Sequence, residues 1–200
     1  MWLLPAPAPT MSRMPPLPSS TSGEPMSTST SDSTAPGPRH SLAGLDLTPF
    51  TFTRRCWVDL PPDSVYPLIS DVSLIETWSP SASAVSYEPG GGPWVGAGFS
   101  GRNRRDGREW VTHSEVVQAD PGSAFAFVVG GAEQGVVRWD WHFYRQGTGS
   151  IVQQTWRLLR TDPVLGDAPE DLHALRDHMA NSAEATLLSL AEWIAGRRSQ

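Results

Sequence analysis

The sequence contains a single cysteine, Cys56, among its 200 residues. One cysteine cannot form an intrachain disulfide, and we do not expect a zinc site built on cysteine thiolates. The lack of disulfides fits a reducing compartment, so we predict a cytoplasmic location.

Charged residues are also few, since Asp, Glu, Lys and Arg make up 18% of the chain. The formal net charge is −6, and the excess acid falls after residue 40. An acidic domain repels a phosphate backbone, so we predict no nucleic-acid partner. The chain also lacks a long apolar run. The short one at its start, Trp2-Leu3-Leu4, has no basic residues before it and is ended by Pro5, so we predict neither a signal peptide nor membrane insertion.

Residues 1–40 contain nine prolines and thirteen serines or threonines, with almost no apolar periodicity. Such a segment cannot bury enough apolar surface to offset the entropy lost on ordering. We therefore predict a disordered tail over residues 1–44 and one folded domain over residues 45–200. Methionines at 11, 14 and 26 leave open a translation start inside the tail.

The longest helical pattern lies at the C-terminal end, over residues 168–195, and would be roughly 40 Å long. Asp167 with Glu170 is typical of a capping box, Pro169 suits the first turn, and Gly196 is expected to end the helix. The apolar stripe of this helix recurs at spacings of three and four residues, at Leu172, Leu175, Met179, Ala183, Thr186, Leu187, Leu190 and Ile194. One long helix against one large sheet suggests a fold that grips a ligand.

The middle of the chain alternates between apolar and polar residues, as strands do. The first run, 50–60, is followed by two short helical segments, about 65–72 and 73–78, and Pro67 is expected to kink or shorten the first. Six more strands follow, at about 85–87, 95–104, 108–118, 124–129, 136–144 and 150–159. Asp106-Gly107 is the strongest hairpin signal, and short turns make successive strands antiparallel.

Alternate residues of each strand point to opposite faces of the sheet, and one face is rich in large apolar side chains. The same face carries four polar residues, Asn103, Thr112, Ser114 and Gln154. A solid core seldom buries four such groups without partners, whereas a ligand pocket has convergent polar groups. The alternative is that the four bond one another, or ordered water, inside an ordinary core.

Two other motifs have plain interpretations. Residues 96–101 match G-x-G-x-x-G, but they lead into a strand rather than a helix, so we predict no dinucleotide site and interpret the glycines as making room for a bent strand or a ligand. His173 and His178 are five residues apart, ~140° around a helix, and do not share a face. His113 and His142 have the parity of the outer face. We therefore predict no metal and no cofactor.

The segments Ser70-Asp71-Val72, Glu76-Thr77-Trp78-Ser79-Pro80 and 95–105 resemble motifs of the START-like (SRPBCC) superfamily, in its polyketide cyclase/dehydrase-like branch. The resemblance covers about residues 50–195. It implies an α+β helix-grip fold: a curved seven-stranded antiparallel sheet around the C-terminal helix, two short helices after the first strand, and a cavity between sheet and helix. Relatives often carry an acidic residue where Gln154 stands, so that acid is missing here.

The function we expect is binding of a small, largely apolar ligand, lipid or polyketide-like, in that cavity. The alternatives left open are a cyclase or dehydratase acting on an aromatic or poly-carbonyl substrate, and an interaction protein whose interior is only packing. The sequence has no recognisable set of nucleophile, base and orienting group, and a monomer and a homodimer are both compatible with it. The residues predicted to line the cavity are Trp78, Phe99, Gly101, Asn103, Trp110, Thr112, Ser114, Phe125, Phe127, Trp139, Trp141, Gln154, Trp156, Met179, Ala183 and Thr186.

Overall fold

The computed structural model describes residues 42, 44–80, 82–105, 108–163, 165–166 and 168–198. The predicted tail, 1–44, lies outside these residues except for Leu42 and Gly44, and Leu42 packs partly buried against the core. The Asp106-Gly107 turn also lies outside them.

The elements, in chain order, are β1 Thr51–Val58, α1 Pro62–Ser70, the 3-10 turn η1 Val72–Leu74, α2 Ile75–Trp78, β2 Ala82–Tyr87, β3 Gly98–Arg105, β4 Arg108–Asp120, β5 Ala124–Val129, β6 Val137–Gln146, β7 Gly149–Leu158 and α3 Pro169–Arg198.

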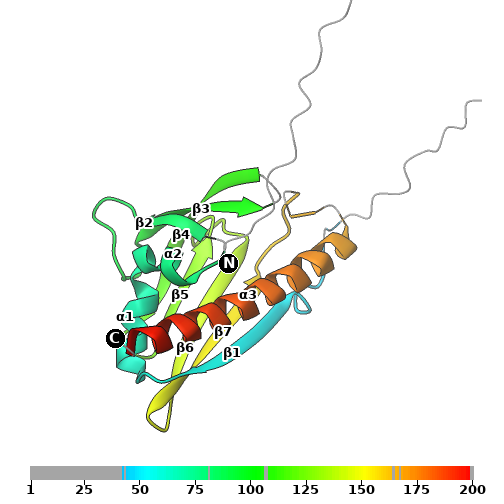
Figure 1. The fold of residues 1–200 in the computed structure, drawn as a ribbon. Helices are drawn as coiled ribbons and strands as arrows, with labels where there is room; N and C mark the ends of the chain where they lie inside the picture. The colour runs from blue at the N-terminus through cyan, green and yellow to red at the C-terminus, as the bar shows by residue number, and fades with distance from the viewer. Residues whose placement is uncertain are drawn as a thin grey trace, which may run out of the picture.

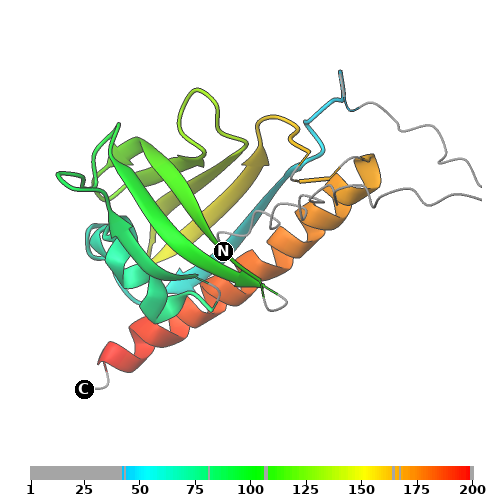
Figure 2. The same cartoon turned by 90° about the horizontal axis from the view of Figure 1, so that it is seen from above.

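The strands form one antiparallel seven-stranded sheet in the order β1-β7-β6-β5-β4-β3-β2. Each strand from β2 to β6 pairs with the strand that follows it in sequence, as short turns require. The first strand, β1, pairs with the last, β7. Helix α3 runs diagonally across the sheet (Figure 1). Figure 2, seen from above, shows the strands curling around α3, with α1 and α2 at the C-terminal end of that helix. The predicted helix-grip fold is confirmed.

The register brings the predicted inner face together. Gly101 lies opposite Thr112 and Asn103 opposite Trp110 across β3 and β4. The same face continues along the sheet, where Phe127 lies opposite Trp139 and Trp139 opposite Trp156. Burial follows this alternation on β7, where residues 152, 154, 156 and 158 are buried and their neighbours are more exposed. The core therefore lies between this face and the helices.

A bulge in β4 changes the alternation that the sequence predicts. Val116 pairs with Phe127, but Gln118 pairs with Ala126, so the register shifts by one residue at Val117. Strict alternation from Val116 would place Gln118 on the inner face. The extra residue turns Gln118 outward, because a bulge reverses the facing of the residues beyond it.

The long helix begins and ends differently from the prediction. Because α3 starts at Pro169, the acidic side chain that reaches back belongs to Asp171 rather than Glu170, and its Oδ2 accepts from the backbone N–H of Ala168 at 3.1 Å. The capping partner predicted at Asp167 lies outside the described residues. The helix continues through Gly196, whose φ is not positive, to Arg198.

The apolar stripe of α3 is buried as predicted. Each of its eight residues, from Leu172 to Ile194, is between 0 and 6% exposed. Helix α1 runs through Pro67 to Ser70, although the sequence favoured a kink or an early end. Pro67 is on the exposed side of α1, where water can reach the carbonyl that loses its N–H donor.

The glycine motif leads into β3, as expected, and Gly98 and Gly101 belong to that strand. A Cβ at Gly101 would lie 3.2 Å from Cγ2 of Val85 on neighbouring β2. The glycine at position 101 therefore allows close packing between β2 and β3 rather than phosphate binding.

Candidate ligand-binding site

The polar part of the predicted site lies on β3 and β4. Asn103, Thr112 and Ser114 are 0%, 6% and 4% exposed. The Asn103 amide Nδ2 donates to Thr112 Oγ1 at 3.0 Å, so part of the alternative prediction, that these groups bond one another, holds. The hydroxyl of Ser114 and the Asn103 amide oxygen, in contrast, have no hydrogen-bond partner in the described part of the chain.

Aromatic side chains form the rest of the sheet side of the site. Trp78 of α2 meets Trp141 edge-on at 5.9 Å, and Phe99 meets Phe127 edge-on at 5.3 Å. These contacts have the geometry that aromatic pairs favour, and they hold the rings in fixed orientations. The predicted aromatic residues on β5, β6 and β7 are all buried: Phe125, Phe127, Trp139, Trp141 and Trp156.

Helix α3 contributes Met179, Ala183 and Thr186, which lie on one face at spacings of four and three residues. Their exposed fractions are 1%, 0% and 0%. The hydroxyl of Thr186 is buried and has no hydrogen-bond partner among the residues that the structure describes. The helix thus presents a small residue, Ala183, between a flexible apolar side chain and a polar one.

Several predicted lining residues carry a buried polar atom that has no hydrogen-bond partner among the described residues. Five of these atoms are Trp78 Nε1, Asn103 Oδ1, Trp110 Nε1, Ser114 Oγ and Thr186 Oγ1. Native proteins leave few buried polar atoms unsatisfied, and each one calls for a partner such as water or a ligand. Their concentration on the inner side of the sheet and on the helices that cover it marks this region as the candidate site.

The described buried polar residues of the predicted lining are electrically neutral. Among the described residues that are polar and buried, Asp140 is the one that carries a charge, and it lies on the outer face. Gln154 of β7, a predicted lining residue, is 0% exposed, and its register partners are Trp141 on β6 and Arg54 on β1. Its amide leaves that position without a charge.

Two buried titratable groups, the Tyr87 hydroxyl and the Cys56 thiol, keep their protons at neutral pH. Burial raises the pKa of Tyr87, and its hydroxyl donates to the Ser70 carbonyl at 2.6 Å. Burial also raises the pKa of the Cys56 thiol to about 11. Neither group is tuned toward pH 7, where a general base works best.

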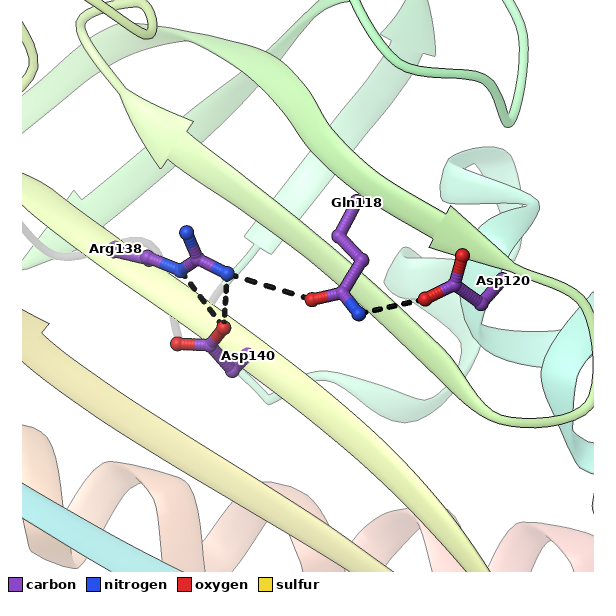
Figure 3. Close-up of polar contacts among 4 residues, drawn as sticks. All are labelled: Gln118, Asp120, Arg138 and Asp140. Atoms are coloured by element: carbon purple, nitrogen blue, oxygen red, sulfur yellow. Dashed lines mark hydrogen bonds and ion pairs between the residues drawn. The ribbon is translucent and has the colours of Figure 1, made fainter.

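The outer face carries a polar row that the sequence did not predict, because the bulge in β4 creates it (Figure 3). Gln118 donates to Asp120 at 2.6 Å and accepts from Arg138 at 3.5 Å, and Arg138 forms an ion pair with Asp140 at 2.7 Å. Asp140 points away from the inner face that holds the candidate site. The row therefore belongs to the outer surface of the sheet and not to this site.

The histidines of the sheet lie on the outer face, as predicted. His113 is exposed and 3.6 Å from Glu88, and His142 is half-buried and stacks on Tyr144 at 6.1 Å. Within the described ranges, no three histidine, cysteine, aspartate or glutamate side chains gather as metal ligands would. No helix in the described part of the chain is long and apolar enough to cross a membrane.

A curved seven-stranded antiparallel sheet, closed by a long C-terminal helix and two short helices after the first strand, defines the START-like class of helix-grip proteins. The chain belongs to the family described as polyketide cyclase / dehydrase and lipid transport, whose model matches residues 49–192. The predicted resemblance is thereby confirmed.

Solved structures agree with this assignment. The polyketide-cyclase-like protein Cgl2372 from Corynebacterium glutamicum is 26% identical, with 73% of this chain and 91% of that chain covered and a TM-score of 0.55. The di-domain aromatase/cyclase StfQ of the steffimycin biosynthetic pathway is 16% identical, covering 76% of this chain and 52% of its own, with a TM-score of 0.61. The chain thus spans about half of StfQ.

The fold extends to plant proteins. Major latex-like protein 151 from Panax ginseng is 11% identical, with 71% of this chain and 95% of that chain covered and a TM-score of 0.55. At such identity the likeness concerns the fold alone. No curated protein matches the sequence.

Proposed function

We propose that this protein binds a small, largely apolar molecule, lipid-like or polyketide-like, between the inner face of the sheet and helix α3, without a metal or a cofactor. The observation that carries the proposal is the set of five buried polar atoms without partners on the inner residues. A bound molecule with a few polar groups would satisfy these atoms, and the aromatic side chains around them suit its apolar part.

The surroundings of these atoms fit such a ligand. Phe99, Trp139 and Trp141 are each at most 1% exposed, so an apolar molecule would be almost fully removed from water there. The family description names lipid transport beside cyclase and dehydrase activity, which supports a carrier of apolar molecules. We place this activity in the cytoplasm, as the single cysteine suggests.

Native mass spectrometry of the purified protein, compared with its mass after denaturation, tests the proposal. We expect either a small molecule that is lost on denaturation or saturable binding of the neutral apolar probe N-phenyl-1-naphthylamine by the emptied protein. Probe binding should also change tryptophan emission, since Trp110, Trp139, Trp141 and Trp156 belong to the predicted lining. A protein that retains no molecule and never binds the probe would show an interior that is only packing, as in an interaction protein.

A cyclase or dehydratase reaction in the same site is the second candidate, and the family description favours it. The hydroxyls of Ser114 and Thr186 have no partner and could relay a proton or orient a carbonyl. Incubation with a poly-β-carbonyl thioester tests this candidate. Cyclised or dehydrated product above the uncatalysed level, lost in Ser114→Ala, would support it, whereas bound but unchanged substrate would leave a carrier.

A further inference from the structure

The orientation of the Asn103 amide is fixed by its neighbours. Its Nδ2 donates to Thr112 Oγ1 at 3.0 Å and approaches the Gly101 carbonyl oxygen at 3.4 Å. Thr112 Oγ1 donates to the same carbonyl at 3.5 Å, so it can only accept from Asn103. A flipped amide would place Oδ1 against the Gly101 carbonyl oxygen, which has no proton to offer. Oδ1 therefore remains the free end of the amide.

Asn103 is 0% exposed, and its buried Oδ1 has no hydrogen-bond donor among the described residues. A buried acceptor without a donor is costly to keep, so a ligand that supplies an N–H or O–H group there gains what the protein alone does not provide. The Asn103 oxygen can therefore bind a ligand group that donates a hydrogen bond, but it cannot interact favourably with an ether or ester oxygen.

A complementary donor lies on the neighbouring strand. Trp110 lies directly opposite Asn103 across β3 and β4, and its indole Nε1–H is buried without an acceptor. Side chains in directly opposite positions of two antiparallel strands are near neighbours. A hydroxyl group placed between the two atoms could satisfy both, because it donates one hydrogen bond and accepts others at its lone pairs.

The charge of the group follows from the neutral surroundings. Of the described buried polar residues, Asp140 is the one with a charge, and it lies on the outer face. The polar residues of the inner face named above, Asn103, Thr112, Ser114 and Thr186, are neutral. An ionised carboxylate or amine would find no counter-charge among the described buried residues of the lining, which costs far more than burying a hydroxyl.

We propose that Asn103 Oδ1 accepts a hydrogen bond from a neutral hydroxyl group of the ligand, and that the Trp110 indole donates to the oxygen of the same group. The site then selects phenols and alcohols over ethers and hydrocarbons of the same shape. This inference rests on the proposed function, since it requires a ligand between the sheet and α3.

Calorimetric titration with 2-naphthol and 2-methoxynaphthalene tests it, because a methyl group in the ether replaces the hydroxyl hydrogen that would donate to Asn103 Oδ1. We expect 2-naphthol to bind about tenfold more tightly, since a site built to bond a hydroxyl rejects the analogue that lacks it. Asn103→Leu should remove this preference and still bind the ether. Thr53→Val, at an exposed position of β1, is the matched control and should keep the tenfold ratio.

Equal affinity of the wild-type protein for the two molecules would overturn the inference while leaving the proposed function intact. The same holds if a folded Asn103→Leu variant keeps the preference for 2-naphthol. If Asn103→Leu does not fold, the wild-type ratio decides by itself. Binding of neither naphthalene, nor of N-phenyl-1-naphthylamine, would overturn the proposed function and the inference together.

Discussion

Arg54 of β1 donates a hydrogen bond from Nε to Glu184 Oε1 of α3 at 2.5 Å, which joins the edge of the sheet to the middle of the long helix. The guanidinium also lies over the Phe52 ring, 5.5 Å from its centroid. This pair explains why a charged residue interrupts the apolar face of the first strand. Both side chains remain partly exposed, and such pairs stabilise a fold little. The helix must therefore be held mainly by its apolar stripe.

The first prediction compares two leucines of α3. Leu190 is 0% exposed and Leu188 is 61% exposed, although they are two residues apart. Leu190→Ala should lower the free energy of unfolding by roughly 2–5 kcal/mol, because it removes buried carbons and leaves a cavity. Leu188→Ala should change it by less than about 0.5 kcal/mol. Urea unfolding measures both, and similar values for the two variants would contradict this packing of α3.

The second prediction concerns Ala84. Among the described residues other than glycine, it is the one with a positive φ, at 48°. It lies at the bulge of β2, exposed, and its backbone N–H donates to the Glu76 carboxylate at 2.9 Å. Ala84→Gly should raise the free energy of unfolding by about 1 kcal/mol, because glycine adopts this conformation without strain.

Ser86→Gly on the same strand, at an exposed position with ordinary φ, is the control. It should lower stability by about 0.5–1 kcal/mol, since glycine loses more backbone entropy on folding. If Ala84→Gly destabilises the protein as Ser86→Gly does, the strain assigned to Ala84 is wrong.

The third prediction follows from the raised pKa of the Cys56 thiol, about 11 in the folded protein against an ordinary 9.0. At pH 8 the folded protein should react with iodoacetamide at least about a hundredfold more slowly than the urea-unfolded chain, because the thiolate is the nucleophile. The folded thiol keeps its proton longer than the unfolded one. Its contribution to stability is thus complete below pH 9 and is lost as the pH rises toward 11.

Cys56→Ser should therefore flatten the fall in stability between pH 9 and pH 11, measured by urea unfolding at each pH. Equal alkylation rates for the folded and unfolded chains would show that Cys56 is not buried in the way described.

The fourth prediction uses Ala183, which is 0% exposed between Met179 and Thr186 on the inner face of α3. If a ligand occupies the region that Ala183 faces, Ala183→Leu should leave the melting temperature near the wild-type value and weaken binding of N-phenyl-1-naphthylamine. Ala185→Leu, at an exposed position of the same helix, should change neither. A loss of about 1–3 kcal/mol in Ala183→Leu would instead indicate a packed interior, and the proposed binding site would have to be abandoned.

Much of the fold could be predicted because one face of each strand is apolar. The pairing of Phe127 with Trp139, and of Trp139 with Trp156, follows the alternation read from the sequence. Gln118 is the exception. Nothing in Val116-Val117-Gln118 indicates an extra residue, because a bulge depends on how two strands meet and not on local preference.

The pairing of polar atoms could not be predicted either. Asn103 bonds Thr112 because the register of β3 and β4 brings them together, whereas Ser114, two residues beyond Thr112, finds no partner. Arg54 finds Glu184 across 130 positions of sequence, which only the docked helix makes possible. The sequence thus predicts which residues face inward, and the structure adds which of their polar atoms have no hydrogen-bond partner among the described residues.

The most direct test of the binding site is an isotope-filtered NOE experiment on the labelled protein with bound 2-methoxynaphthalene, which does not depend on the hydroxyl preference. We expect NOEs from the naphthalene protons to the methyl groups of Ala183 and Thr186 and to the ring of Phe127. NOEs confined to the exposed aromatic residues Trp57, Trp94 and Tyr144, with none to the inner residues, would contradict a ligand site between the sheet and α3.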